Sequence, residues 1–114
     1  RRAFSGSFDQ TIRVWDTTAW TCLRVLTGHE SGICTMIVAG DWLISGSVDI
    51  LVWNLNDLSR HCSLPGHNGG VNELAVVGKK VLGAFDDKLI RVWNVHTWQL
   101  ERTIEGHVGA VYAL

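Results

Sequence analysis

Short runs in which hydrophobic and polar residues alternate recur along almost the whole chain. A period of two with many β-branched residues is typical of β-strands that bury one face. We expect such strands at residues 11–15, 23–26, 33–38, 42–45, 71–77, 81–85, 89–93 and 100–104. Turn-forming segments separate them, at residues 39–41, 68–70, 78–80 and 86–88. No stretch of ten or more residues keeps a helical period, so a helical repeat is excluded.

Three markers return in one register along this strand pattern. Tryptophan follows valine three times, 38 and 40 residues apart, at Trp15, Trp53 and Trp93. A Gly-His pair ends 14 residues after each of these tryptophans, at positions 29, 67 and 107. An aspartate precedes each tryptophan by a few residues, at positions 9, 49 and 87. The chain is therefore an internal repeat with about four short strands per period, which leaves few architectures.

Residues 5–16, with the sequence SGSFDQTIRVWD, contain a motif that is characteristic of one protein family. The motifs of one repeat follow in a fixed order: a Gly-His pair, about twenty residues, Ser-Gly-Ser-x-Asp and then Thr-Ile-Arg-Val-Trp-Asp. This order resembles the WD40-repeat β-propeller family, and the likeness covers essentially the whole chain. The resemblance implies four-stranded blades arranged radially, with strand a innermost and strand d on the rim. The fold class that it implies is all-β, a WD40-type β-propeller segment of about twelve short antiparallel strands in three blade equivalents.

The repeat register divides the chain into four parts. Residues 1–27 supply strands b, c and d of a first blade, residues 28–65 form a second repeat, residues 66–105 a third, and residues 106–114 begin a further repeat with its strand a. Three blade equivalents are too few for a closed ring. We expect the ring to be completed either by the remaining blades of a longer protein or by a second copy of this chain.

Serine, histidine and aspartate in one repeat suggest a hydrolase triad, but the set returns in successive repeats together with a tryptophan. The resemblance implies instead a structural tetrad, in which aspartate accepts from histidine, histidine bonds serine, and serine bonds the tryptophan N–H. One tetrad is His29, Ser45, Asp49 and Trp53. A second is His67, Asp87 and Trp93, with Gly83 in place of the serine. The partial sets are Ser5, Asp9 and Trp15 without a preceding histidine, and His107 without a following aspartate.

The b–c hairpin of the second repeat is two residues shorter than its counterparts. Asp49 lies four residues before Trp53, whereas Asp9 lies six residues before Trp15. We expect either a tighter turn, which would open space beside the central channel where this family receives peptides, or a harmless deletion.

Two sets of residues are candidates for binding a partner. Trp20, Leu58 and Trp98 each lie five residues after the repeat tryptophan, in the c–d connection. They either pack over their own blade or form an apolar partner surface. Glu30, Asn68 and Val108 follow the Gly-His pairs. They would line the top face, the side of the propeller that carries the b–c turns and the connections between blades.

Composition narrows the partners further. The formal net charge is -1 and no basic block is present, so nucleic acid is not expected as a partner. No apolar run has the length of a membrane helix, so no membrane partner is expected. Cys22, Cys34 and Cys62 are odd in number and spaced unlike a zinc motif. They predict free thiols in an intracellular protein, cytoplasmic or nuclear, with neither a metal nor a cofactor.

These patterns together favour a non-catalytic scaffold that binds proteins or peptides through its top face and rim. One alternative is the substrate-recognition propeller of a ubiquitin ligase complex, and another is a truncated repeat array without a function of its own. The alternative from a different class is a Ser/His/Asp hydrolase, which would need an exposed set of these residues.

Overall fold

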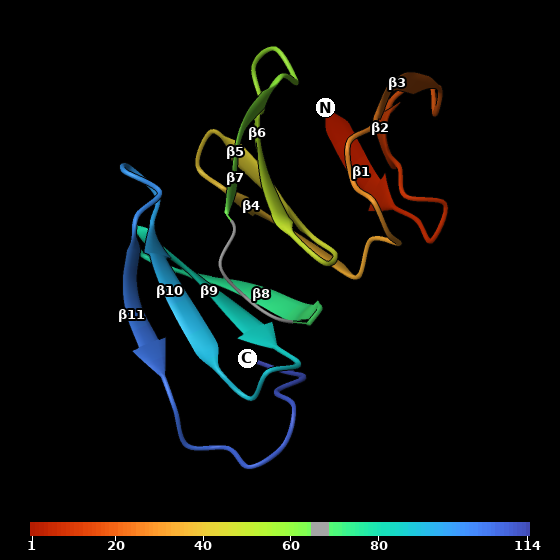
Figure 1. Ribbon diagram of the computed structural model, residues 1–114. Coiled ribbons are helices and arrows are strands. Elements are labelled where there is room, and N and C mark those ends of the chain that lie inside the picture. Colours follow the sequence, from red (N-terminus) through yellow and green to blue (C-terminus); the bar gives the residue numbers. More distant parts are fainter. Residues whose placement is uncertain (65–68) are drawn as a thin grey trace.

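A computed structural model describes residues 1–64 and 69–114. Its strands form three separate antiparallel sheets, each a meander in sequence order (Figure 1). Blade 1 contains β1 (Arg2–Gly6), β2 (Ile12–Asp16) and β3 (Cys22–Leu26). Blade 2 contains β4 (Thr35–Ala39), β5 (Trp42–Gly46), β6 (Ile50–Asn54) and β7 (Arg60–Leu64). Blade 3 contains β8 (Val71–Val77), β9 (Lys80–Phe85), β10 (Ile90–Asn94) and β11 (Leu100–Ile104). The expected all-β architecture of three blade equivalents is confirmed.

The c–d ladders of the three blades share one irregularity. In each blade the pairing between strands c and d, the third and fourth strands of the repeat, shifts register just before the repeated tryptophan, at Trp15, Trp53 and Trp93. A shift of this kind is a β-bulge, which bends the strand and strengthens its twist. The repeat seen in the sequence is therefore also a repeat of backbone geometry.

The described chain contains eleven strands rather than about twelve, because residues 111–114 are not a strand. A strand is defined by its ladder, and this segment has no neighbouring strand to pair with in the described chain. It is nevertheless held in place, since the Val111 N–H donates to the Phe85 carbonyl at 3.0 Å. Ile33 and Val71 donate in the same way to Ser7 and Ser47, at 3.0 and 2.9 Å. Each blade thus fixes the chain that enters the next one.

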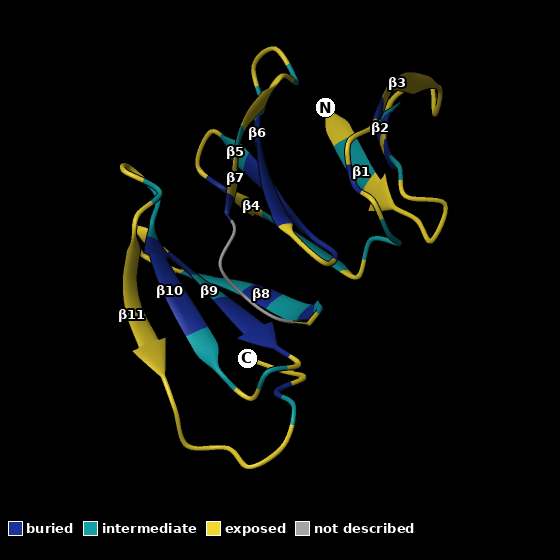
Figure 2. Ribbon diagram, in the orientation of Figure 1, coloured by how far each residue is buried: buried dark blue, intermediate teal, exposed yellow. Residues whose placement is uncertain are grey.

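The apolar cores lie between the blades. In the central sheet, Leu43, Leu51 and Trp53 pack toward blade 1, and their neighbours Ile44 and Val52 pack toward blade 3. This alternation is the consequence of a strand pointing successive side chains to opposite faces. Blade 2 is consequently buried on both sides, whereas β11 at the rim of blade 3 is exposed (Figure 2).

Two sheet faces at the ends of the blade series remain uncovered. On blade 1 the side chains of Trp20, Leu23 and Val25 are exposed. On blade 3 an open hollow of about 350 Å³ has Leu82 and Val92 in its wall. None of the described residues belongs to a helix with the length and apolar character needed to cross a membrane.

Candidate functional site

Three residues of blade 2 form a buried polar chain. The indole N–H of Trp53, on β6, donates to the Ser45 hydroxyl on β5 at 2.9 Å. The Nε2 atom of His29, in the connection that precedes β4, lies 2.6 Å from the same hydroxyl oxygen. Ser45 is fully buried, and His29 and Trp53 are 8% and 4% exposed. One serine therefore satisfies two side chains that would otherwise be buried without a partner.

Asp49 does not take part in the hydrogen bonds that join His29, Ser45 and Trp53. In its b–c turn the Ser47 N–H donates to the Asp49 carbonyl, two residues later, at 2.9 Å. In the longer b–c turn of blade 1 the Ser7 N–H donates to the Thr11 carbonyl, four residues later, at 3.1 Å. The shortening is thus a genuinely tighter turn. Asp49 is exposed, and within residues 1–64 and 69–114 its carboxylate forms no hydrogen bond to His29.

The electrostatics around His29 follow from this arrangement. Burial lowers the pKa of His29 below its ordinary value, the negative charge of Asp49 partly opposes that shift, and Arg60 adds to it. Burial disfavours the charged form of an imidazole, so the neutral ring is the stable one here. A catalytic triad needs an aligned carboxylate and an accessible serine. Ser45 is fully buried, and among the described residues no carboxylate is hydrogen-bonded to His29.

Blade 3 replaces the serine with an aromatic contact. Gly83 stands at the position of Ser45, and a Cβ atom added to Gly83 would lie 2.8 Å from the Phe85 ring. Phe85 is fully buried and meets Trp93 edge-on, with ring centroids 5.9 Å apart. The guanidinium of Arg91 lies 4.7 Å from the Phe85 centroid and pairs with Asp87 at 2.7 Å. Ring packing thus occupies the space in which blade 2 has a hydroxyl.

Of the remaining tetrad candidates, Ser5 and Trp15 are brought together by a hydrogen bond in blade 1. His67 lies outside the described residues. In blade 1 the Trp15 indole donates to Ser5 at 2.8 Å in an exposed setting, and Asp9 accepts from the backbone and hydroxyl of Thr11. His107 is exposed, and within the part of the chain that the structure describes it is hydrogen-bonded to neither Ser5 nor Asp9.

The c–d turns share one backbone geometry. Trp20, Leu58 and Trp98 have φ angles of 58°, 61° and 55°, in the left-handed region. Each donates its N–H to the carbonyl four residues earlier, at 2.8, 2.8 and 2.7 Å. Only glycine adopts this conformation without strain, so each side chain is held there at a small energetic cost.

The three c–d side chains have different surroundings. Trp20 is 69% exposed. Leu58 packs against the cluster between blades 1 and 2, and Trp98 against the cluster between blades 2 and 3. Trp98 meets Trp42 of blade 2 edge-on, with centroids 5.8 Å apart. The turn residue therefore reaches the preceding blade instead of packing over its own blade alone.

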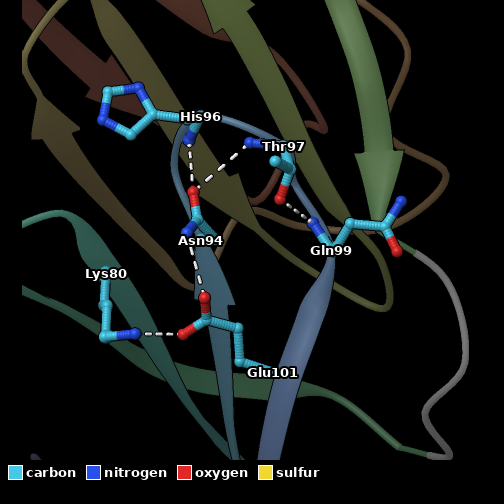
Figure 3. A network of polar contacts seen from close by, with 6 residues as sticks. All are labelled: Lys80, Asn94, His96, Thr97, Gln99 and Glu101. Atoms are coloured by element: carbon cyan, nitrogen blue, oxygen red, sulfur yellow. Dashed lines mark hydrogen bonds and ion pairs between the residues drawn. The ribbon is translucent and has the colours of Figure 1, made fainter.

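The c–d turn of blade 3 is fixed by side chains on both sides (Figure 3). The side-chain Oδ1 of Asn94 accepts from the backbone N–H groups of His96 and Thr97, and its Nδ2 donates to Glu101 at 2.9 Å. Glu101 also pairs with Lys80. The His96 ring extends away from this network (Figure 3). The turn is thus held by polar contacts within blade 3.

On the top face, Glu30 and Val108 are both exposed, Val108 by 94%, and Asn68 lies outside the described residues. The sequence reasoning missed two further apolar side chains at this face. Phe8 and Val48, at the tips of b–c turns, are 91% and 44% exposed. Their signal was a large apolar residue in a turn, between the Ser-Gly-Ser motif and the aspartate.

Among the described residues no three His, Cys, Asp or Glu side chains gather in a way that could hold a metal ion. Cys22, Cys34 and Cys62 are free thiols, and partial burial raises the pKa of Cys62.

Comparison with known proteins gives one consistent result. A family model described as "WD domain, G-beta repeat" matches residues 1–16, 20–53 and 58–94. The F-box/WD repeat-containing protein sel-10 of Caenorhabditis elegans is 35% identical over 121 residues, which cover 96% of this chain and 21% of sel-10. The WD repeat-containing protein pop1 of Schizosaccharomyces pombe is 28% identical over 163 residues, with the same two shares.

Solved structures agree with the sequence relatives. The structure of U3-55K superimposes with a TM-score of 0.93 at 28% identity, over 98% of this chain and 38% of that one. The crystal structure of the RRP9 WD40 repeats gives the same score and identity. The chain spans about a fifth of the length of pop1 and of sel-10.

Proposed function

The chain belongs to the WD40-repeat family, and from this premise we propose that it is a non-catalytic scaffold that binds proteins or peptides through its top face and its c–d turns. Fold alone does not define a function. The proposal therefore depends on what the surfaces and the buried polar chain of this particular sequence can do.

The observation that carries the proposal is the state of Ser45. Its side chain is fully buried, and its oxygen accepts a hydrogen bond from Trp53. A nucleophile must reach its substrate and be activated by an oriented base. The Ser45 hydroxyl is enclosed instead, so the combination that suggested a hydrolase supports a structural role.

The surfaces support the binding half of the proposal. Phe8 and Val108 expose apolar side chains on the top face. Trp20, whose counterparts Leu58 and Trp98 pack against a preceding blade, exposes its indole in the described chain. Exposed aromatic and aliphatic side chains of this kind are typical of binding surfaces. An intracellular location, with protein partners and no nucleic acid, is part of the same proposal.

A fluorophosphonate that labels active serines tests the non-catalytic half. We expect no adduct on the native chain and no change in this result for Ser45→Ala. A stoichiometric adduct on Ser45 under native conditions would overturn the proposal. Denatured protein serves as the control for non-specific labelling.

A second candidate is substrate recognition in a ubiquitin ligase. It is favoured by the likeness to an F-box/WD repeat-containing protein at 35% identity. This candidate predicts that the protein co-purifies with ubiquitin-ligase subunits. Their absence from a complex that still contains other stable partners would leave the general scaffold as the better account.

A further inference from the structure

The contact between blades 1 and 2 is closed by two arginines on the c–d side. Arg2, at the start of β1, donates to the Leu55 carbonyl at 2.6 Å. Arg24, on β3, donates to the Asp57 carbonyl at 3.1 Å. Both acceptors belong to the c–d turn of blade 2. The preceding blade thus supplies two guanidinium groups to the turn of the blade that follows it.

The contact between blades 2 and 3 lacks both donors. Trp42 holds the strand position of Arg2, since each pairs with the last residue of its neighbouring strand c. Cys62 holds the strand position of Arg24, since Cys62 pairs with Val52 as Arg24 pairs with Val14. The corresponding acceptors in blade 3 are the carbonyls of Val95 and Thr97. Among the described residues neither carbonyl accepts a hydrogen bond.

A hollow of about 310 Å³ lies at this second contact. Its walls come from the a–b turns of both blades and from the c–d turn of blade 3, and they consist of Ala39, Gly40, Asp41, Trp42, Gly78, Lys79, Val95 and His96. The hollow is therefore lined by Trp42, Asp41 and Val95, and Val95 is the counterpart of the Leu55 that accepts from Arg2 at the first contact. In the described chain the Asp41 carboxylate has no ion-pair partner.

We propose that this hollow, here called the arginine pocket, binds an arginine side chain of a partner protein. Guanidinium is planar, donates several hydrogen bonds at once and packs on indole surfaces. It can bond the Val95 carbonyl as Arg2 bonds Leu55, pair with Asp41, and lie against Trp42. The chain itself supplies the precedent, since its own Arg2 donates to the corresponding carbonyl, that of Leu55, at the first contact.

Two further residues of the wall are Lys79 and His96. Lys79 is exposed, and its flexible stem can keep the ammonium in solvent. The His96 ring extends away from the turn network (Figure 3). Lys79 occupies in blade 3 the position of Asp41 in blade 2. The Lys79 carbonyl accepts from the Val95 N–H at 3.0 Å, as the Asp41 carbonyl accepts from the Leu55 N–H at 2.9 Å. The charge of Lys79 weakens the pocket for a cation, and Lys79→Asp is expected to strengthen it.

This inference rests on the proposed scaffold function and names the chemistry of one partner contact. Its test needs no protein partner, so the pocket can fail while the scaffold proposal stands.

N-acetyl-arginine amide is titrated into the full chain while the indole N–H resonances of Trp42 and Trp98 are followed by NMR. We expect a saturable shift, with binding several-fold weaker for N-acetyl-lysine amide. Asp41→Asn should weaken binding of the arginine probe about tenfold, the loss typical of a charge-assisted contact. Both Asp41 and Lys79 are exposed, so their variants leave the core intact.

Trp42→Arg is the matched variant, because it recreates the side chain found in the first contact. It should fill the pocket from within and abolish the shift of Trp98. Absence of any shift in the wild-type chain would overturn the proposal, as would equal affinity for the two probes or binding that Asp41→Asn leaves unchanged. Binding retained by a folded Trp42→Arg chain would have the same consequence.

Discussion

At the scale of single residues, the same motif is satisfied differently in each blade. Ser45 joins Trp53 and His29 in the dry interior of blade 2, and Ser5 joins Trp15 at an exposed site. Blade 3 has Gly83 in place of this serine and packs Phe85 against Trp93. Burial decides what each contact contributes, because an unsatisfied polar group costs most where water cannot reach it.

Replacing Ser45 with alanine removes the partner of two buried groups. We expect Ser45→Ala to lower the free energy of unfolding by about 1–3 kcal/mol. Ser5→Ala is the matched control, and it should cost less than about 1 kcal/mol since water can replace the lost hydroxyl. Urea denaturation of both variants measures the difference. Equal losses would show that the blade 2 chain has no special role.

Stability should depend on pH through His29. Its folded-state pKa is lowered by burial, so the unfolded chain binds the proton first as the pH falls. The contribution of the neutral ring is therefore present above the unfolded value of about 6.5 and is lost as the pH drops from there toward the folded pKa. His29→Gln should flatten the stability profile between about pH 7.5 and 5.5. An unchanged slope in that variant would contradict the assignment.

The Gly83 and Phe85 pair should behave as a unit. Gly83→Ser alone crowds the Phe85 ring and is expected to cost about 1–3 kcal/mol. Phe85→Ser alone leaves a cavity and should cost about 3–5 kcal/mol. The double variant recreates the serines of blade 2, so its loss should be smaller than the sum of the two. Strict additivity in a double-mutant cycle would refute steric exclusion as the reason for glycine.

At the scale of elements, strand positions follow directly from the sequence, because alternation and turn residues are local properties. The segment 42–45 was expected to be a strand and lies in β5. The contacts of the c–d turns were not predictable in this way. Whether Leu58 and Trp98 pack on their own or on a neighbouring blade depends on how the sheets are placed against each other. Phe8 is different, because a large apolar residue in a b–c turn is itself a local signal of an exposed apolar side chain.

At two of the c–d turns, replacing tryptophan with glycine should change stability in opposite directions. Trp20→Gly removes an exposed indole from a left-handed position, so stability should stay the same or rise by up to about 1 kcal/mol. Trp98→Gly relieves the same backbone strain but removes packing on Trp42, and it should lose about 2 kcal/mol or more. Thermal unfolding of the two variants decides the matter. A loss of similar size in both would mean that backbone geometry dominates these turns.

At the scale of the whole molecule, the repeat explains both the strength and the incompleteness of the sequence prediction. The family, the three blade equivalents and the Ser45–Trp53 pairing are consequences of a motif that recurs. The arginine pocket and the separation of Asp49 from His29 arise where one repeat departs from the others, at Trp42 and at the shortened b–c turn. Such departures have physical meaning only once the neighbouring blade is in place.

The central claim is that this chain acts through its surfaces and not through a serine nucleophile. Quantitative mass spectrometry of co-purified proteins tests it most directly, with wild type compared with Phe8→Asp and Val108→Asp on the top face, Trp20→Asp at a c–d turn, and Ser45→Ala. The account predicts that at least one folded surface variant loses a defined set of partners. Ser45→Ala should retain the same partners under conditions where this variant is folded. Identical partner sets for all folded surface variants would contradict it.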